Sequence, residues 1–393
     1  MDKFEATLAD VTNPESGFML GAIGLVVNNQ GKILYHHAAG RQKLGDDTPI
    51  NPNSTVSWTS VAKFPTHIAV MQFVERGLIK LDDPVEKHIP EMGKLPLIKK
   101  GDDGQFIISK PKRKMTIMDV LTHTCGIASE DHPLVESFLK SEHAAEIHEM
   151  IADKTRPLLR LICLPLIFEP GEGFMWGRST YTFQYLVQKL GEQNFVLVIK
   201  ELIFEPLQMG TATYLPHEAP ATWERRLQMV EPEPETGKLV PCEENNRGFT
   251  CSMTDMAVLL ADMLSPSGSK LLSQESMNLL LEPQLTPVQR ESLRQNTDNF
   301  YFVTEHEPGP LILPPPEVNW TAGGLLYVEK ELQRSGFPPG TVTWEGMGNV
   351  LFCLNKERGV AMLFGASFWP LKRHVNDVAN LFMKCAWEAY PHA

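Results

Sequence analysis

An uncharged helical stretch, residues 64–74, places the strongest constraint on how this chain can fold. It includes Ile68 and Phe73 among many apolar residues, and it ends just before Gly77, a residue type that often terminates helices. Pro65 stands in its first turn, where a missing backbone N–H costs least. Because the segment is apolar around most of its circumference, it predicts a helix buried in a large core.

A serine and a lysine open this helix as the motif Ser60-Val-Ala-Lys63. Residues three apart lie on one face of a helix, about 5–6 Å between Cβ atoms, so the Lys63 amine can take the proton of the Ser60 hydroxyl. A lysine beside an apolar helix is costly to bury unless it functions or is paired. We therefore interpret Ser60 as a nucleophile and Lys63 as its base. The structural alternative is a capping serine with a lysine that reaches solvent.

The composition is that of a globular protein with one large core or two subdomains: 393 residues, 42% hydrophobic and 21% charged. A net charge of −12 without a long basic run argues against a nucleic-acid partner. The N-terminal residues do not form a signal peptide and no apolar run reaches membrane-spanning length, so we expect a cytoplasmic protein without a membrane partner. The six cysteines lack metal-like spacing, which predicts reduced thiols, and we predict no metal or cofactor.

Strand-like segments lie near both ends of the chain, and helical segments lie between them. The strand-like segments are 21–27, 32–36, 324–328, 342–352 and 359–364, and the main helical ones are 115–123, 144–164, 182–204, 256–264 and 375–390. This order predicts an α/β fold (an α+β sandwich) with one antiparallel sheet formed by N- and C-terminal segments. We place a sheet subdomain at about 1–60 and 320–393 and an inserted helical subdomain at about 61–319. Residues 216–246 are expected to form a long excursion or a lid, and 308–316 a proline-rich loop.

Six segments in order resemble the serine β-lactamase and penicillin-binding-protein superfamily, in its class C, esterase-like branch, and most of all the fungal transesterases of the lovastatin-acyltransferase kind. They are Ser60–Lys63, 71–84, 121–127, Glu169–Gly171, 248–255 and Trp344–Gly346. The resemblance implies a mixed α/β sandwich and an acyl-enzyme on Ser60. It also implies that the N–H groups of Ser60 and Met347 form the oxyanion hole, and that His123 has a structural place at a helix end.

The chain departs from the family pattern at two positions. Where such enzymes carry a tyrosine for proton transfer, this chain has Trp176, whose indole N–H donates only and cannot act as a base. Three explanations compete: Lys63 is the sole base, Tyr181 or another group substitutes, or acyl chemistry has been abandoned. The triplet Trp344–Gly346 stands where the family would have Lys-Thr-Gly or a more glycine-rich triplet. Its lack of that lysine matches esterase and acyltransferase relatives better than enzymes that recognise β-lactams.

The candidate substrate pocket lies around the glycine-rich loop 168–179 and the last of these motifs. Its predicted residues are Phe174, Trp176, Arg178, Tyr181, Trp344 and Gly346. Most of them are aromatic, so we expect an apolar pocket. The Arg178 guanidinium could bind an acid or a phosphopantetheine group.

These observations lead to an acyltransferase or an ester or thioester hydrolase of fungal-type secondary metabolism, acting on an apolar, polyketide-like small molecule. A thioester of an acyl-carrier protein or of coenzyme A is the candidate acyl donor. The first alternative is a cyclase, isomerase or dehydratase on the same fold, and the second is a non-catalytic binding protein. Acylation of Ser60 distinguishes the leading hypothesis from both.

Overall fold

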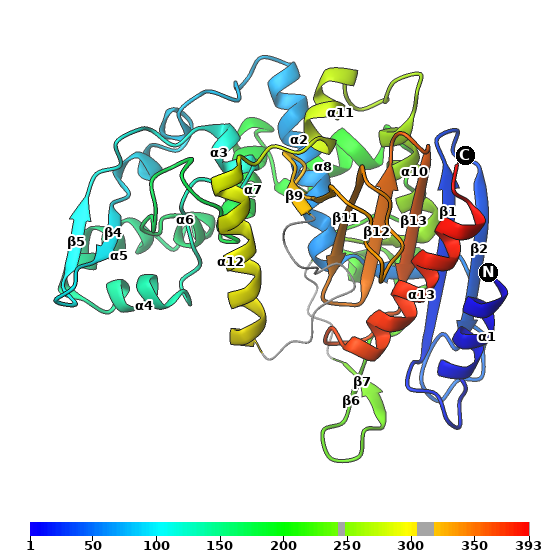
Figure 1. Ribbon diagram of the computed structural model, residues 1–393. Helices are drawn as coiled ribbons and strands as arrows, with labels where there is room; N and C mark the ends of the chain where they lie inside the picture. Colours follow the sequence, from blue (N-terminus) through cyan, green and yellow to red (C-terminus); the bar gives the residue numbers. More distant parts are fainter. Residues whose placement is uncertain (243–247, 305–317, 393) are drawn as a thin grey trace.

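The computed structural model describes residues 1–242, 248–304 and 318–392, which are arranged around one seven-stranded sheet (Figure 1). Its strand order is β2-β1-β13-β12-β11-β10-β9, and every neighbouring pair is antiparallel. The strands are β1 (Gly21–Asn28), β2 (Ile33–Gly40), β9 (Val318–Trp320), β10 (Leu326–Val328), β11 (Thr341–Gly346), β12 (Val350–Asn355) and β13 (Val360–Gly365). N- and C-terminal segments therefore share one sheet, which confirms the predicted α/β fold.

The other elements flank this sheet or lie in the middle of the chain. The helices are α1 (Asp2–Val11), α2 (Lys63–Glu75), α3 (Ile117–Leu121), α4 (Pro133–Leu139), α5 (Ala145–Ile151), α6 (Pro157–Ile162), α7 (Ser179–Leu190), α8 (Phe195–Ile199), α9 (Pro220–Glu224), α10 (Met253–Leu264), α11 (Gln274–Leu281), α12 (Pro287–Thr304) and α13 (Arg373–Ala389). The described residues also form three small two-stranded antiparallel pairs: β3 (Thr55–Ser57) with β8 (Thr250–Ser252), β4 (Leu97–Lys100) with β5 (Phe106–Ser109), and β6 (Val230–Pro232) with β7 (Leu239–Pro241). Short 3₁₀ helices are η1 (Thr59–Ala62), η2 (Val85–Lys87), η3 (Pro90–Lys94), η4 (Glu142–Ala144) and η6 (Pro216–Glu218), and η5 (Lys200–Phe204) is a short π-helix.

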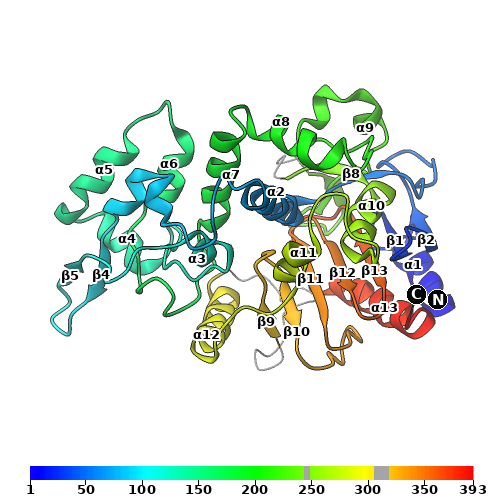
Figure 2. The same cartoon turned by 90° about the horizontal axis from the view of Figure 1, so that it is seen from above.

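Helices cover both faces of the sheet (Figures 1 and 2). On one face, α1 and α13 pack together, with the rings of Phe4 and Phe382 5.0 Å apart. On the other face lie α2 and α10, which separate the sheet from the helical middle of the chain. Because both faces are covered, β1 and β13 are buried along their whole length.

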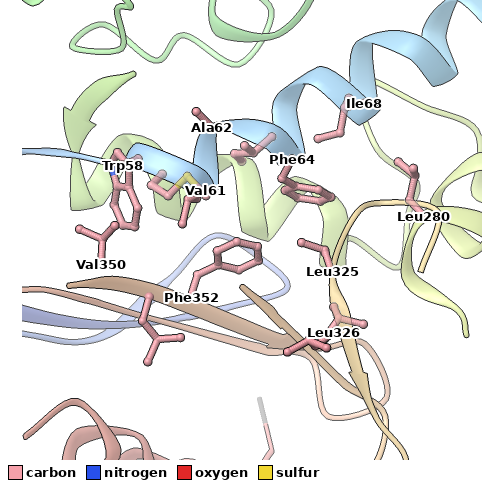
Figure 3. Packing of buried hydrophobic residues seen from close by; sticks show 14 of the residues in the cluster. Trp58, Val61, Ala62, Phe64, Ile68, Leu280, Leu325, Leu326, Val350 and Phe352 are labelled. Carbon is pink, nitrogen blue, oxygen red and sulfur yellow. The ribbon is translucent and has the colours of Figure 1, made fainter. Parts of the chain in front are cut away.

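Helix α2 is the buried helix that the uncharged stretch predicts. Residues 64–73 are all buried. Phe64 and Ile68 point toward the sheet, where the ring of Phe64 stacks on that of Phe352 at 5.7 Å between centroids (Figure 3). Burying apolar side chains of this size stabilises the fold by about 1.5–3 kcal/mol each. The core thus fixes the position of the residues at the start of α2.

Two predicted helices are wrong in their continuity. The 144–164 segment is interrupted after Ile151, because the Asp153 carboxylate accepts hydrogen bonds from the Thr155 backbone and hydroxyl and Pro157 cannot continue a helix. The 182–204 segment is interrupted after Leu190, and Asn194 caps a new helix by accepting from the Val196 N–H. Local hydrogen bonds by Asp and Asn compete with the helix in both places.

Four other expectations have different outcomes. The strand-like run 342–352 consists of two strands, because the chain turns between them with Asn349 at φ +54°. Of the predicted lid, the described part up to residue 242 contains η6, α9 and the β6–β7 hairpin, and the expected proline-rich loop lies outside the described residues. The subdomain boundaries stay a prediction.

The cysteines and the helix lengths agree with the composition. In the described part of the chain, the six cysteines form no disulfide with one another. Among the described residues, no helix combines the length and apolarity that crossing a bilayer requires.

Candidate active site

Ser60 lies in a tight turn between a strand and a helix. The turn is η1, which joins β3 to α2, and its first residue, Thr59, has φ +29°, a value that non-glycine residues seldom adopt. Gly248 packs directly against this residue, since a Cβ at Gly248 would lie 2.5 Å from the Thr59 carbonyl oxygen. The turn therefore presents Ser60, which is partly exposed, at the start of the buried helix.

Lys63 begins α2, one turn after Ser60. Burial lowers the pKa of its amine from 10.5 to about 8, as the apolar surroundings of the helix predict. Its Nζ lies 5.9 Å from the ring centroid of Trp344. At pH 7 about a tenth of such an amine is neutral, which provides a usable base.

The end of β11 approaches the backbone of Ser60. A Cβ on Gly346 would lie 2.0 Å from Thr59 Oγ1 and 3.2 Å from the Ser60 backbone nitrogen, so only glycine fits. Met347 follows directly in the turn to β12. The structure thus brings the two predicted oxyanion-hole segments together.

Four rings form an aromatic cluster next to Lys63: Phe174, Trp176, Trp320 and Trp344. Their neighbouring centroids are 5.1–6.1 Å apart and the pairs meet edge to face. Trp320, on β9, is a residue that the sequence analysis missed. A signal was present, because Trp320 stands three residues before Gly323, next to the predicted strand 324–328.

Helix α12 holds the loop that carries Trp176. The Gln289 side chain donates to the Gly171 carbonyl at 2.8 Å, and the Asn296 amide donates to the Phe174 carbonyl at 2.8 Å. Between them, the Ser292 hydroxyl accepts from the Phe174 N–H at 2.9 Å. These bonds fix the loop backbone, so its aromatic side chains have defined positions.

This arrangement of a serine turn, a lysine and a glycine-terminated strand can be compared with known proteins. A family model described as Beta-lactamase matches residues 15–377. The chain belongs to the beta-lactamase family. The resemblance predicted from the motifs is confirmed.

Several relatives of this member of the beta-lactamase family match it along most of its length. Acyltransferase calJ from Penicillium decumbens is 26% identical, covering 99% of this chain and 99% of the relative. Monacolin J acid methylbutanoyltransferase from Aspergillus terreus is 23% identical, over 94% of this chain and 92% of the relative. Lovastatin esterase from Penicillium rubens is 25% identical, over 84% of each. The solved structure of simvastatin synthase from Aspergillus terreus matches with a TM-score of 0.85 and 20% identity, over 100% of this chain and 99% of that one, and shows the shared fold.

Arg178 and Tyr181 interact with each other at the start of α7 of this family member. The guanidinium of Arg178 lies 5.3 Å from the Tyr181 ring centroid, and its Nε donates to Glu130 at 2.8 Å. In the described part of the chain, these contacts do not connect either residue to Ser60 or Lys63. Their place in the pocket stays a prediction.

Two buried histidines lie behind Lys63. His67 is one helical turn further along α2, and burial lowers the pKa of its imidazole to about 4. Burial also holds the pKa of His123 well below its usual value, and its ring packs on Trp320 at 5.3 Å between centroids. Both imidazoles are therefore neutral at pH 7, and the position of His123 just beyond α3 agrees with the structural place predicted for it. His67 was missed, although its spacing of four from Lys63 is visible in the sequence.

Proposed function

We propose that this chain forms an acyl-enzyme on Ser60, with Lys63 as the base, and passes the acyl group to an alcohol or to water. One observation carries the proposal: the glycine-terminated strand approaches the Ser60 nitrogen while an amine of lowered pKa stands one turn away. Structural serines and lysines need neither the strained turn nor the close approach.

The chemistry follows from these positions. Neutral Lys63 takes the proton of the Ser60 hydroxyl as the oxygen attacks an ester or thioester carbonyl carbon, and the carbonyl π electrons move to its oxygen. The N–H groups of Ser60 and Met347 donate to that oxyanion. When the carbon–oxygen or carbon–sulfur bond breaks, the Lys63 ammonium returns the proton to the leaving group. The acyl-enzyme then reacts with an alcohol or water by the same steps in reverse order.

An apolar, polyketide-like substrate is the class that the surroundings support best. The aromatic cluster offers a large apolar surface beside Lys63. Relatives along most of the chain are named as an acyltransferase, a methylbutanoyltransferase of monacolin J acid and an esterase of lovastatin. A thioester of a carrier protein or of coenzyme A is the proposed acyl donor.

A second candidate function rests on Trp176. An indole stands where the family pattern has a phenol, and it packs at 5.9 Å between centroids against Trp344. Such packing favours a pocket re-purposed to shape a reactive substrate, as in a cyclase, isomerase or dehydratase. A non-catalytic binding protein is the third hypothesis, and neither alternative requires acylation of Ser60.

Intact-mass measurement separates these functions. The wild-type chain and Ser60→Ala are incubated with a panel of acyl thioesters and oxygen esters, and the protein mass is recorded. The proposal predicts an added acyl mass on the wild-type chain alone. A panel that leaves the wild-type mass unchanged while native substrate is converted would favour the re-purposed enzyme.

A further inference from the structure

Buried polar atoms without hydrogen-bond partners gather around Lys63. In the described ranges they include Nε2 of His67, Nδ1 of His123, and the indole nitrogens of Trp320 and Trp344. A buried group left without a partner costs about 1–3 kcal/mol, so a cluster of them calls for an explanation.

The partnered ring nitrogens fix the tautomers of both imidazoles. Nδ1 of His67 lies 2.8 Å from the Ala322 carbonyl oxygen, which only accepts, so Nδ1 carries the proton and Nε2 has a free lone pair. The Met175 backbone raises the pKa of the His123 imidazole, as a carbonyl beside a ring N–H does, and because Nδ1 has no partner this N–H is assigned to Nε2. Nδ1 of His123 is then the lone-pair nitrogen. Both unpartnered imidazole nitrogens are therefore acceptors.

Both imidazoles lie near Lys63, because the charge of its amine contributes to lowering the pKa of each. His67 is four residues after Lys63 and lies on the same face of α2. The ring of Trp320 contacts both His123 and Trp344, at 5.3 and 5.1 Å between centroids. Lys63 in turn lies over the ring of Trp344. A bridging water needs two to four polar partners, which this group of atoms supplies.

We propose that His67 and His123, through a bound water, and the face of Trp344 stabilise the ammonium that forms on Lys63 while Ser60 is acylated. The two histidines are positioning residues, and the inference rests on the proposed function. The proton leaves Ser60 Oγ as its oxygen–carbon bond forms, and it resides on Lys63 Nζ until the leaving group takes it. No phenol is available at position 176 to share that charge.

Neutral acceptors suit this task better than a carboxylate. A carboxylate beside Lys63 would hold the amine protonated at rest and remove the base. Lone pairs and an aromatic face attract the cation more weakly, so they leave the pKa of the amine low enough for a neutral fraction to act as the base. Among the described residues, the imidazoles whose pKa responds to the charge of Lys63 are those of His67 on α2 and His123 beyond α3. Glu345 lies on the opposite face of β11, because Trp344 and Gly346 face α2.

Crossed substitutions test the proposal. In His67→Gln the amide reaches the place of Nε2, whereas in His67→Asn it reaches only that of Nδ1. For His123 the relation is reversed, because Nδ1 is the acceptor, so His123→Asn keeps the proposed contact and His123→Gln keeps only the bond to Met175. We expect H67N and H123Q to lower the acylation rate constant about tenfold at about pH 9, and H67Q and H123N to lower it less. His148→Asn, at an exposed histidine of α5, is the matched control.

The pH profile distinguishes this role from packing. Losing an acceptor destabilises the Lys63 ammonium and lowers the pKa of the amine. The pH range over which the acylation rate rises should therefore move to lower pH, and the loss of rate should be smaller at pH 6 than at pH 9. The proposal is overturned if H67N and H123Q, which keep the Ala322 and Met175 bonds, lose less acylation rate than H67Q and H123N. It is also overturned if the loss of rate is equal at every pH. If the wild-type chain is acylated and H67N and H123Q show the same dependence of rate on pH, this inference alone fails. An absence of wild-type acylation overturns the proposed function and this inference together.

Discussion

The turn that carries Ser60 and the loop that carries Trp176 both contribute side chains to the candidate active site. Their backbones are held in position in different ways. The first is held by its own strained backbone and by glycines that approach it, at Gly248 and Gly346. The second is held from outside, by side-chain hydrogen bonds from α12. The Ser60 turn leads to the proposed nucleophile and base, while the loop carries Trp176 where the family resemblance implies a tyrosine.

This difference shows which parts of the site tolerate a change of chemistry. Backbone geometry around Ser60 leaves no room for a Cβ at position 346. The loop is fixed through backbone groups of Gly171 and Phe174, which leaves the side chain at position 176 free to differ. The account therefore places essential chemistry on the turn and substrate shape on the loop.

The largest expected effect is that of Ser60→Ala. Acylation and turnover should be abolished, because the Ser60 hydroxyl is the proposed attacking group. The free energy of unfolding should change by less than about 0.5 kcal/mol, since the hydroxyl contributes little packing. Full turnover in S60A, measured on native substrate and on test esters, would mean that the essential group lies on the Trp176 loop and not on the Ser60 turn.

Lys63→Met should be nearly as damaging, and adding it to S60A should cost little more, because nucleophile and base act as a unit. The same change should stabilise the fold at pH 7 by about 1–3 kcal/mol, because Lys63 has a lowered pKa of about 8 in the folded chain. Below pH 8 the amine is charged in both states and the full burial cost is present. Stability of the wild type should rise between pH 8 and about 10.5, and the difference from K63M should shrink there.

A denaturant series on both proteins across that pH range measures the effect. A constant difference, or a less stable K63M at pH 7, would mean that burial does not lower the pKa of this amine. Additive losses of activity in the double variant would mean that the two side chains do separate jobs.

Gly346→Ala should come next in size. The added methyl would stand 2.0 Å from Thr59 Oγ1 and 3.2 Å from the Ser60 nitrogen, so it displaces an oxyanion donor and should slow acylation about a hundredfold. Combining it with Thr59→Ala removes the closer contact and should restore part of the rate. Wild-type rates in G346A would show that β11 does not contribute to the oxyanion hole.

Trp176→Tyr should have the smallest effect, and its sign sharpens the comparison. If Lys63 is the sole base, the added phenol should maintain or raise cleavage of simple esters. If the indole shapes the pocket for the native substrate, native turnover should fall by about 1–3 kcal/mol of transition-state stabilisation. Trp176→Phe, which adds no phenol, is the control. Unchanged rates on both substrates would make Trp176 a packing residue.

Local patterns explain what the sequence could predict. The two-strand hairpin at the N-terminus, the buried α2 and the Ser60–Lys63 spacing depend on residues close in the chain, and each is present in the structure. Contacts between distant segments could not be inferred in the same way. Trp320 reaches the aromatic cluster because β9 lies in the same sheet as the strand of Trp344. Ser292 of α12 holds the Trp176 loop although it is more than 100 residues away in the sequence. The helix interruptions near Asp153 and Asn194 depend on side-chain hydrogen bonds that an apolar pattern does not reveal.

The rate of Ser60 acylation as a function of pH tests the central claim most directly, that a lysine whose pKa is lowered by burial serves as the base without a tyrosine. The wild-type chain is mixed with an acyl thioester, quenched at intervals and analysed by mass of the peptide containing Ser60. The account predicts acylation confined to that peptide, with a rate that rises about tenfold per pH unit and levels off near pH 8. A rate independent of pH between 6 and 9, or an acyl group on another residue, would contradict it.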